Sequence, residues 1–525
     1  MNTAYDYAGL LTALWPVVIV FAGASLSLLA EAVLPRSWRR GWQIGITLLT
    51  LILAFVSALA MWGNDNALAQ DQTGMIMVDP PALVSWFGLL IFGALTVLLF
   101  AEREVYGGVS AFTPSGSAIP GSNDERAATE AGFEHTEVYT LLLFSLLGMM
   151  MFTAANDLLM MFVALEIMSL PLYLLCGLAR RRRLISQEAA MKYFLLGALA
   201  SAFFLFGVAL VFGYSGSFRF ATIASQIGSS QVGEGMLFAG LLTMAVGLLF
   251  KVGAVPFHSW VPDVYTGAPT PVTAFMAVCT KVAAVGGLLR VFYVALGAER
   301  WNWQPVIATV AVATMLFGAV VGLAQTDIKR LLAYSSITHA GYILVAVAGA
   351  AQVSAGITGI TSVSAASFYL LTYGVATLAA FGMLTMVRDN GAEVTQLSGW
   401  AGIGRRNPVF GVVMAIFMLS FAGIPLTGGF MGKWAAFEAA YEGGFGWLAL
   451  VGVLLSVVAA VYYLRVIAVM FFREPVEGPE VTDTSAATLI VVVVGLIATV
   501  LLGVMPGPVM GFLQQASEFY RLGML

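Results

Sequence analysis

Charged residues are scarce in this sequence of 525 residues. Asp, Glu, Lys and Arg make up only 10% of it and hydrophobic residues 60%, whereas a soluble domain carries about 25% charged residues. So few charges cannot cover a water-exposed surface, but a surface that faces lipid needs none. The small net charge of −4 provides no basic stripe that could neutralise phosphates, which excludes a nucleic-acid partner.

Cysteines and cofactor motifs are also nearly missing. The two cysteines, Cys176 and Cys279, lie in apolar runs and outside any metal-ligand spacing, so the sequence predicts neither a metal centre nor a disulfide framework. There is no Walker loop, dinucleotide glycine fingerprint, haem-attachment motif or iron–sulfur cysteine cluster. We therefore expect no cofactor in this chain, and energy that comes from a gradient or from a partner protein.

The sequence has long apolar runs instead. About 20 mostly apolar residues are enough for one membrane crossing. No Lys or Arg precedes the first run, so we expect it to be a retained helix and not a signal peptide. The pattern predicts an all-α polytopic membrane protein with about 14 transmembrane helices, near 10–34, 42–62, 82–101, 136–153, 156–177, 188–213, 235–254, 271–296, 304–325, 329–350, 357–387, 408–440, 446–472 and 486–505.

Basic residues in the connecting loops predict the orientation. Of the 24 basic residues, 15 fall in odd-numbered loops, whereas the even loops and tails hold only Arg219, Arg300 and Arg521. Because loops rich in Lys and Arg stay in the cytoplasm, both termini are predicted to lie outside. The odd-loop residues are Arg36, Arg39, Arg40, Arg103, Arg126, Arg180, Arg181, Arg182, Arg183, Lys329, Arg330, Arg388, Arg405, Arg406 and Arg473.

The longest polar stretch, 102–135, is rich in Gly, Ser, Pro and acidic residues. It predicts a cytoplasmic loop that is partly disordered or docks a partner, and a tolerated insertion is the alternative. We expect four parts in the chain: a three-helix segment with this loop, a first and a second helical repeat, and a C-terminal helix and tail, over 1–135, 136–296, 297–472 and 473–525.

Lysine is used sparingly and in an unusual place. Of the five lysines, we place only Lys329 in a loop. Arginine stays protonated almost everywhere, whereas a buried lysine can release its proton, so this division indicates reversible protonation inside the membrane. Arg290 and Arg465, near span ends, are expected to reach the interface with their long side chains. The other four lysines lie in or at the edge of spans: Lys192, Lys251, Lys281 and Lys433.

Glu166 lies near the middle of the fifth predicted span. An unpaired charge at that depth is costly, so we expect a partner on the inside of the bundle. Lys251, at the end of the apolar run of the seventh span, is the obvious candidate. A purely structural ion pair is the alternative, but one pair does not explain four intramembrane lysines.

Two spans are predicted to be broken. The seventh has Pro256 just beyond Lys251, and the twelfth has Pro425 and several glycines before Lys433. Proline removes a helical donor, and carbonyls freed at membrane depth are tolerated only beside protein or water, so each break is expected to line a hydrated pocket. The breaks fall five spans apart, which predicts two inverted five-helix repeats, spans 4–8 and 9–13, with broken helices 7 and 12.

Histidine occurs three times. His339, in the tenth span, titrates near neutral pH and predicts either a proton relay or a hydrogen-bonded packing residue. His258 follows the break of the seventh span and is expected to have a structural or entrance role. His135 lies in the acidic loop and is expected to be solvated.

Three long motifs resemble a known family, the antiporter-like membrane subunits of respiratory complex I and of multisubunit cation/proton antiporters. They are FKVGAVPFHSWVPDVYTGAPTPV at 250–272, AQTDIKRLLAYSSI at 324–337 and EAAMKYFLLG at 188–197, and the resemblance covers roughly 136–472. The sequence is most similar to the N branch, subunit N of NADH-quinone oxidoreductase and its mitochondrial counterpart, subunit 2. Lys281 stands where the L branch usually has histidine, and Lys433 where the M branch usually has glutamate.

The resemblance implies a proton-translocating subunit in the bacterial plasma membrane, which couples quinone reduction to proton transport. Glu166 and Lys251 would be the paired switch of one half-channel, Lys281 the central relay and Lys433 the terminal donor toward the outside. FMN, iron–sulfur clusters, NADH and quinone would bind other subunits. The expected partners are the bilayer and other membrane-arm subunits, including a neighbouring antiporter-like subunit. A subunit of a multisubunit Na⁺/H⁺ antiporter is the alternative, and a purely structural scaffold is a third reading.

Overall fold

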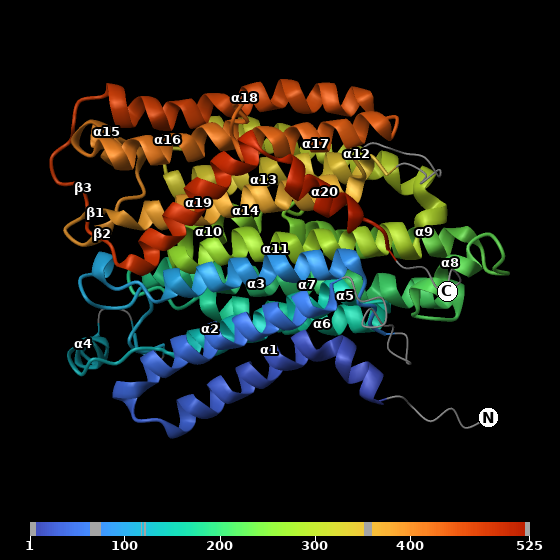
Figure 1. Ribbon diagram of the computed structural model, residues 1–525, viewed down its shortest axis with the longest axis horizontal. Coiled ribbons are helices and arrows are strands. Elements are labelled where there is room, and N and C mark those ends of the chain that lie inside the picture. The colour runs from blue at the N-terminus through green and yellow to red at the C-terminus, as the bar shows by residue number, and fades with distance from the viewer. Residues whose placement is uncertain (1–6, 63–74, 117, 120–121, 351–359, 520–525) are drawn as a thin grey trace.

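Helices that run side by side along one axis make up almost the whole molecule (Figure 1). The computed structural model describes residues 7–62, 75–116, 118–119, 122–350 and 360–519. The first half of the described chain contains α1 (Tyr7–Val33), α2 (Arg36–Met61), α3 (Pro80–Phe100), η1 (Glu104–Tyr106), α4 (Asn123–Glu130), α5 (Glu137–Ala154), α6 (Leu158–Cys176), α7 (Arg183–Ser215), α8 (Phe220–Gln226), α9 (Glu234–Val252), α10 (Trp260–Gly267) and α11 (Thr270–Arg290).

The second half continues the same arrangement and adds three short strands. It contains η2 (Val291–Ala295), η3 (Gly297–Glu299), α12 (Arg300–Leu323), α13 (Ile328–Ala348), α14 (Ser362–Met386), β1 (Val387–Asp389), β2 (Ala392–Glu393), η4 (Leu397–Trp400), α15 (Ile403–Arg406), α16 (Pro408–Ala422), α17 (Gly428–Glu442), α18 (Gly446–Phe472), β3 (Glu480–Val481), α19 (Ala486–Val504) and α20 (Gly507–Gln515).

The membrane-spanning plan predicted from the sequence is confirmed. Thirteen helices of the described chain are long and apolar enough to cross a bilayer. The fourteenth crossing is the predicted twelfth span, which forms two shorter helices, α16 and α17, on either side of its break. Of the eleventh span, expected over 357–387, residues 357–359 lie outside the described residues, and α14 accounts for the rest.

The seventh span is broken as well. α9 ends at Val252, and the short helix α10 resumes only at Trp260. Gly253 ends α9 with φ 81° and Gly423 ends α16 with φ 82°, a left-handed backbone that glycine adopts without strain. Both helices therefore stop inside the bundle and leave their last carbonyls free for side chains.

The two breaks belong to a structural repeat, in which helix-ending glycines and helix-capping aspartates recur at a separation of 170 residues. Gly253 and Gly423 are one such pair. Asp157 caps the N-terminus of α6 and Asp327 that of α13, each by accepting a hydrogen bond from backbone amides of the first turn. The predicted spans 4–8 and 9–13 therefore correspond to α5–α11 and α12–α18.

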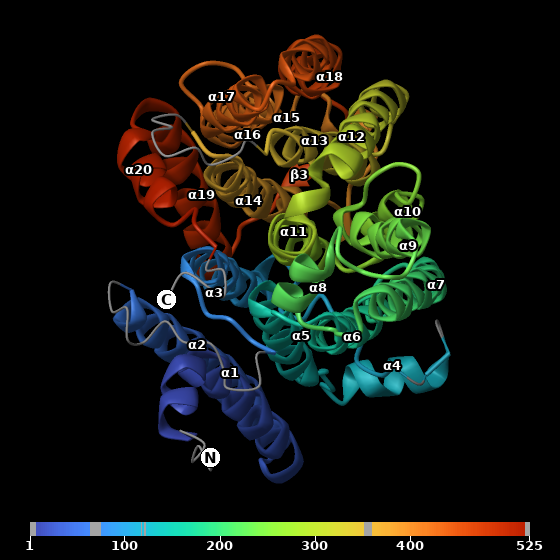
Figure 2. The same ribbon diagram turned by 90° about the vertical axis from the view of Figure 1, so that its right-hand side faces the viewer.

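Helix packing follows the same period. A Cβ atom on Gly148 of α5 would collide with the backbone amide of Met168 in α6, and one on Gly318 of α12 would meet the backbone amide of Thr338 in α13. Both helix pairs thus cross through a glycine at equivalent positions. The end-on view in Figure 2 shows the two halves side by side, with α11, α13 and α14 near the centre.

The arginine-rich turns gather at one end of the bundle, where α4, α15 and the strands also lie (Figure 1). The three strands form a small antiparallel sheet in the order β2-β1-β3, in which Arg388 of β1 faces Glu393 on one side and Glu480 on the other. The described beginning of α1 and the end of α20 lie toward the opposite end, in agreement with an even number of crossings.

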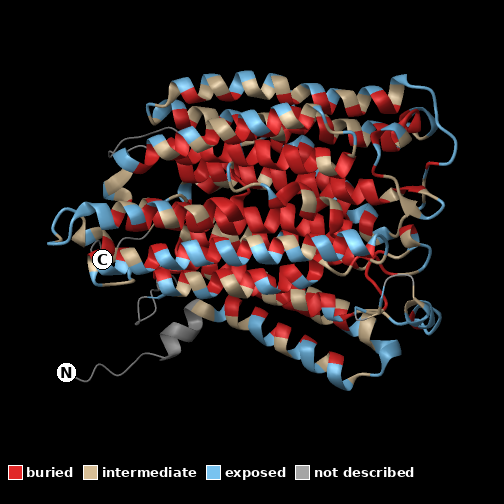
Figure 3. Cartoon of the chain, turned by 180° about the vertical axis from the view of Figure 1, so that it is seen from behind, coloured by how far each residue is buried: buried red, intermediate tan, exposed pale blue. Residues whose placement is uncertain are grey.

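The burial pattern in Figure 3 distinguishes the central helices from the peripheral ones. α11, α13 and α14 are buried over nearly their whole length, whereas α1, α2, α18 and α19 expose large apolar side chains along one face. A lipid-facing surface has this composition. The polar side chains of the middle of the molecule must therefore find their partners within the protein.

The stretch 102–135 folds against its own chain in its described part. Arg183 donates to the carbonyl oxygens of Gly116 and Ala118 and forms an ion pair with Glu125 at 3.2 Å. The Arg103–Glu134 ion pair closes the loop from the other side. The described residues of this stretch are therefore held against the rest of the chain around the short helix α4.

Candidate functional site

Lys251 lies fully inside the bundle at the last turn of α9. Its ammonium donates to Ser169 Oγ at 2.7 Å and lies over the rings of Tyr173 and Tyr193 at 5.5 and 5.4 Å from their centroids. Two aromatic faces and one hydroxyl stabilise the cation without neutralising it. The site can therefore hold a proton and can also give it up.

Glu166 does not form the direct ion pair with Lys251 that the sequence predicts. Among the described residues no carboxylate oxygen lies within 4.0 Å of the Lys251 ammonium, and Glu166 Oε1 is buried without a hydrogen-bond partner. Ser169, which is one helical turn after Glu166 on the same face of α6, takes the place of the partner. The charge of Glu166 still acts on Lys251 through space.

Lys281 reaches the end of the broken helix from α11. Its ammonium donates to the carbonyl oxygen of Val252, the last residue of α9, at 2.8 Å. The C-terminal end of a helix carries partial negative charge, which favours a cation there. Lys281 thus binds the backbone of the residue that follows Lys251 in the chain.

Lys433 occupies the second break in the same manner. Its ammonium donates to the carbonyl oxygens of Phe421 and Ala422, at 2.9 and 2.8 Å, which are the last two of α16. A third hydrogen bond goes to Ser456 Oγ of α18 at 2.6 Å. All three N–H donors of this buried ammonium are therefore hydrogen-bonded to protein oxygens.

His339 lies between the two lysine sites on α13, the central helix. Its Nδ1 atom is 2.7 Å from Tyr369 Oη, and its Nε2 atom is 3.1 Å from Tyr463 Oη. The charges of Lys281 and Lys433 both act on this ring. Both readings of His339 are thus compatible with its contacts: it is hydrogen-bonded on both sides, and its partners are hydroxyls that can pass a proton.

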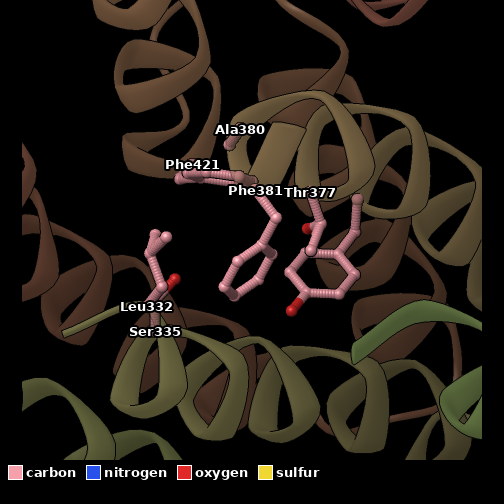
Figure 4. A pocket seen from close by; sticks show the side chains of 7 residues that line it. Leu332, Ser335, Thr377, Ala380, Phe381 and Phe421 are labelled. Atoms are coloured by element: carbon pink, nitrogen blue, oxygen red, sulfur yellow. The ribbon is translucent and has the colours of Figure 1, made fainter. Parts of the chain in front are cut away.

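A narrow pocket lies where α13, α14 and α16 meet (Figure 4). Two of its lining residues, Tyr373 and Phe421, pack against the His339 ring, with centroids 4.8 and 5.7 Å away. Its lining comes from three helices, with Leu332 and Ser335 on α13, Tyr373, Thr377, Ala380 and Phe381 on α14, and Phe421 on α16. The hydroxyl of Ser335 is 2.5 Å from Tyr463 Oη, the group that contacts His339. The pocket is therefore linked to the histidine by a short chain of hydroxyls.

Lys329 is not the loop residue that the sequence predicts. α13 begins at Ile328 because Asp327 caps it, so Lys329 falls in the first turn, where it is buried. Its ammonium donates to the carbonyl of Ala268 at 3.0 Å and to Thr270 Oγ1 at 3.1 Å. Like Lys281 and Lys433, this lysine reaches the C-terminal end of a half-helix, here α10.

Lys192, expected among the intramembrane lysines, lies on an open face of α7. Its ammonium pairs with Glu188 at 2.7 Å and Asp263 at 2.8 Å, and its side chain is 42% exposed. Asp263 also pairs with Arg330 of α13 at 2.9 Å. These groups form a separate cluster on the surface, apart from the buried lysines.

Of the two arginines expected to reach the interface, Arg290 is buried inside the protein, whereas Arg465 stays partly exposed. Arg290 is 1% exposed and forms an ion pair with Asp79, which is fully buried, at 2.5 Å. Arg465 donates to the carbonyl oxygens of Leu323 and Gln325 at the end of α12. The prediction for Arg290 is wrong, because an acid supplied by the start of α3 was not recognised.

The remaining histidines are peripheral. The ring of His258 packs against Phe317 of α12, with centroids 4.4 Å apart. His135 accepts a hydrogen bond from the backbone amide of Gly116 at 2.8 Å and is partly shielded within the loop. Within the described residues no group of three His, Cys, Asp or Glu side chains could hold a metal ion.

The structure thus defines a polytopic helical membrane protein in which buried lysines meet the interrupted ends of half-helices. Residues 155–459 match the family described as NADH:quinone oxidoreductase/Mrp antiporter, TM. NADH-quinone oxidoreductase subunit N of Cutibacterium acnes is 54% identical over 96% of this chain and 95% of its own length. The subunit N of a Nocardioides species is 50% identical over 97% and 98%.

Solved structures agree with this relationship. A chain of respiratory complex I from Thermus thermophilus, with bound aureothin, is 34% identical and covers 96% of this chain and 100% of its own, with a TM-score of 0.74. A chain of the Mrp complex from a Dietzia species shares the fold alone, at 20% identity, 97% coverage of both chains and a TM-score of 0.79. The chain belongs to the family of NADH-quinone oxidoreductase subunit N.

Proposed function

We propose that this chain is the subunit of a bacterial NADH-quinone oxidoreductase that moves protons across the membrane when quinone is reduced. The observation that carries the proposal is that two buried lysines bind the carbonyl ends of interrupted helices: Lys281 of α11 at the end of α9, and Lys433 of α17 at the end of α16. A charge held inside a membrane protein without a permanent counter-ion is costly, and such groups mark ion or proton pathways.

In the proposed mechanism, Glu166 favours the protonated form of Lys251 through space. Movement of the negative charge away from Lys251 makes the ammonium less stable, and the proton passes by way of internal water and the end of α9 toward Lys281. From there it reaches His339 and then Lys433, which releases it to the outside. Ammonium groups repel one another, so loading of one site favours emptying of the next.

We assign the redox cofactors and the quinone site to other subunits of the complex. NADH, FMN, the iron–sulfur clusters and the quinone are assigned to other subunits, and the partners are the other membrane-arm subunits, with a neighbouring antiporter-like subunit among them. We assign the chain to the plasma membrane with both ends outside, because its arginine-rich turns gather at one end of the bundle (Figure 1).

The test uses Lys433→Ala in the assembled complex, in native membranes supplied with NADH. We expect loss of proton pumping together with slower quinone reduction, because the terminal carrier is gone. Arg300→Ala, at a partly exposed basic residue at the start of α12, is the control and should leave both activities unchanged. Normal pumping by an assembled Lys433→Ala complex would refute the proposal, and Na⁺/H⁺ exchange would then be measured in the same vesicles.

A further inference from the structure

A carboxylate and a lysine lie together at the arginine-rich end of the bundle, between the two repeats. Glu393, on β2, accepts hydrogen bonds from Thr270 Oγ1 at 2.8 and 2.7 Å, and its Oε1 is 3.9 Å from the Lys329 ammonium. The side chain of Glu393 is 17% exposed and that of Lys329 is 5% exposed. The acid of this pair is therefore in contact with water, and the lysine lies in the protein interior.

One face of α13 connects this pair to the centre of the molecule. Lys329, Leu332, Ser336 and His339 follow one another at steps of three, four and three residues, which places them on the same side of a helix. Ser336 Oγ is 3.4 Å from Tyr265 Oη. One turn beyond the apolar Leu332, this face of the helix therefore carries hydroxyl groups. The helix thus leads from the surface pair to the buried histidine.

The pocket in Figure 4 lies along this route. It begins at Leu332, one turn inward from Lys329, and its polar groups are the hydroxyls of Ser335, Tyr373 and Thr377. Beyond it, Ser335 Oγ contacts Tyr463 Oη at 2.5 Å, and Tyr463 Oη contacts His339 Nε2 at 3.1 Å. A proton that reaches the pocket therefore has a continuous chain of hydroxyls to the imidazole.

We propose that Glu393 and Lys329 form a proton-uptake site of the second repeat, which supplies His339 through the pocket independently of Glu166 and Lys251. The inference rests on the proposed function, since it assigns where the transported proton is collected. The Glu393 carboxylate takes a proton from bulk water, and its neutral form is no longer attracted by Lys329. The proton then passes along the hydroxyls of the pocket and Tyr463 to the imidazole nitrogen that carries no proton, and the carboxylate is regenerated.

The other acid at this end is less suited to this task. Asp263 lies between Lys192 and Arg330, both more than one third exposed, and it forms an ion pair with each at 2.8 and 2.9 Å. Two direct cation partners keep its carboxylate charged and oppose proton uptake. Glu393 has one ion-pair partner, Lys329, at the longer distance of 3.9 Å. Arg388 faces it across the β1–β2 pair but donates to the carbonyl oxygens of Thr385 and Gly391. Fewer direct ion pairs therefore oppose proton uptake at Glu393 than at Asp263.

The experiment measures pumping by the assembled complex in inverted membrane vesicles, in which the uptake side faces the bath. For Glu393→Gln we expect severalfold slower pumping at alkaline bath pH, with recovery as the bath is acidified, because direct protonation of the pocket then replaces the lost carboxylate. The matched control is Glu480→Gln, an exposed acid on β3 of the same sheet, whose pH profile should equal that of the parent. A parental profile for assembled Glu393→Gln overturns the proposal.

A second variant tests the inner end of the route. Ser335→Ala removes the hydroxyl between the pocket and Tyr463 and should show the same loss at alkaline pH, whereas Ser201→Ala, a buried serine of α7 in the first repeat, should not. If Ser335→Ala also keeps the parental profile while Lys433→Ala stops pumping, the proposed function stands and the uptake site is refuted. If Lys433→Ala pumps normally, the proposed function itself fails. Ser335→Ala gives the decisive result should Glu393→Gln not assemble.

Discussion

The ammonium of Lys251 donates to Ser169 Oγ at 2.7 Å, although Glu166 lies one turn away on the same helix. The acid is thus near enough to act on the lysine by its charge but does not neutralise it by contact. A cation in a tight ion pair would be fixed in its protonated form. The intervening serine leaves the proton of Lys251 exchangeable, and the position of the Glu166 charge decides how firmly it is held.

Removal of the Glu166 charge tests this control. Glu166→Gln should slow proton pumping strongly, because Lys251 then loses the negative charge that stabilises its protonated form, while the complex still assembles. Pumping is followed in membrane vesicles with NADH, and assembly is followed by the yield of purified complex. Glu188→Gln is the matched control, since Glu188 is an exposed acid on α7. Normal pumping by Glu166→Gln would remove Glu166 from the mechanism.

Removal of the serine should have a separate effect. A hydrogen bond to a charged group contributes about 1.5–3 kcal/mol, so Ser169→Ala should reduce the rate of pumping about tenfold or more if the protonated form of Lys251 limits it. Quinone reduction measured on the same membranes should fall in parallel, because the two processes are coupled. A rate equal to that of the parent would mean that water replaces the serine hydroxyl without loss.

The variant His339→Phe tests whether this histidine relays protons or serves only in packing. Phenylalanine fills the space among Tyr369, Tyr463 and Phe421 but has no nitrogen that carries a proton. We expect an assembled complex with little pumping, measured by the quench of a pH-sensitive dye. An assembled complex that pumps at the parental rate would show that His339 serves packing alone.

The buried Arg290–Asp79 pair makes a prediction about stability. Arg290→Ala leaves the Asp79 carboxylate buried and uncompensated, which costs about 3–5 kcal/mol, so the yield and the unfolding temperature of the complex should fall. The double variant Arg290→Met, Asp79→Asn removes both charges and should recover much of the loss. Failure of the double variant to recover would mean that the hydrogen bond from Arg290 to the carbonyl of Thr153 matters more than the ion pair.

Close approach of α12 and α13 makes a further prediction. Gly318→Ala places a methyl group against the backbone amide of Thr338, and overpacking of this kind costs about 1–3 kcal/mol. The thermal stability of the purified complex should therefore fall. Gly235→Ala, at a helical glycine where a Cβ atom meets nothing within 4 Å, should cause no loss. Equal stability of the two variants would contradict the close crossing.

The membrane class, the number of crossings and the two broken helices follow from the sequence alone. Their causes are local: an apolar run long enough for the bilayer hides its own backbone polar groups only as a helix, and a left-handed glycine followed by proline ends that helix at both breaks. The scarcity of lysine likewise pointed to Lys251, Lys281 and Lys433, which are buried, but it missed buried Lys329 and included Lys192, which lies on the surface. Gly253 and Gly423 show that the predicted breaks lie where the sequence places them.

Partner choice was decided only by the tertiary structure. Ser169 accepts from Lys251, Ser456 from Lys433 and Asp79 from Arg290, and these partners come from other helices at sequence separations of 82, 23 and 211 residues. Nothing in the spacing of one helix states which side chains a second helix presents to it. Charge and hydropathy determine that a buried lysine needs acceptors, but only the packing of distant helices determines which atoms provide them.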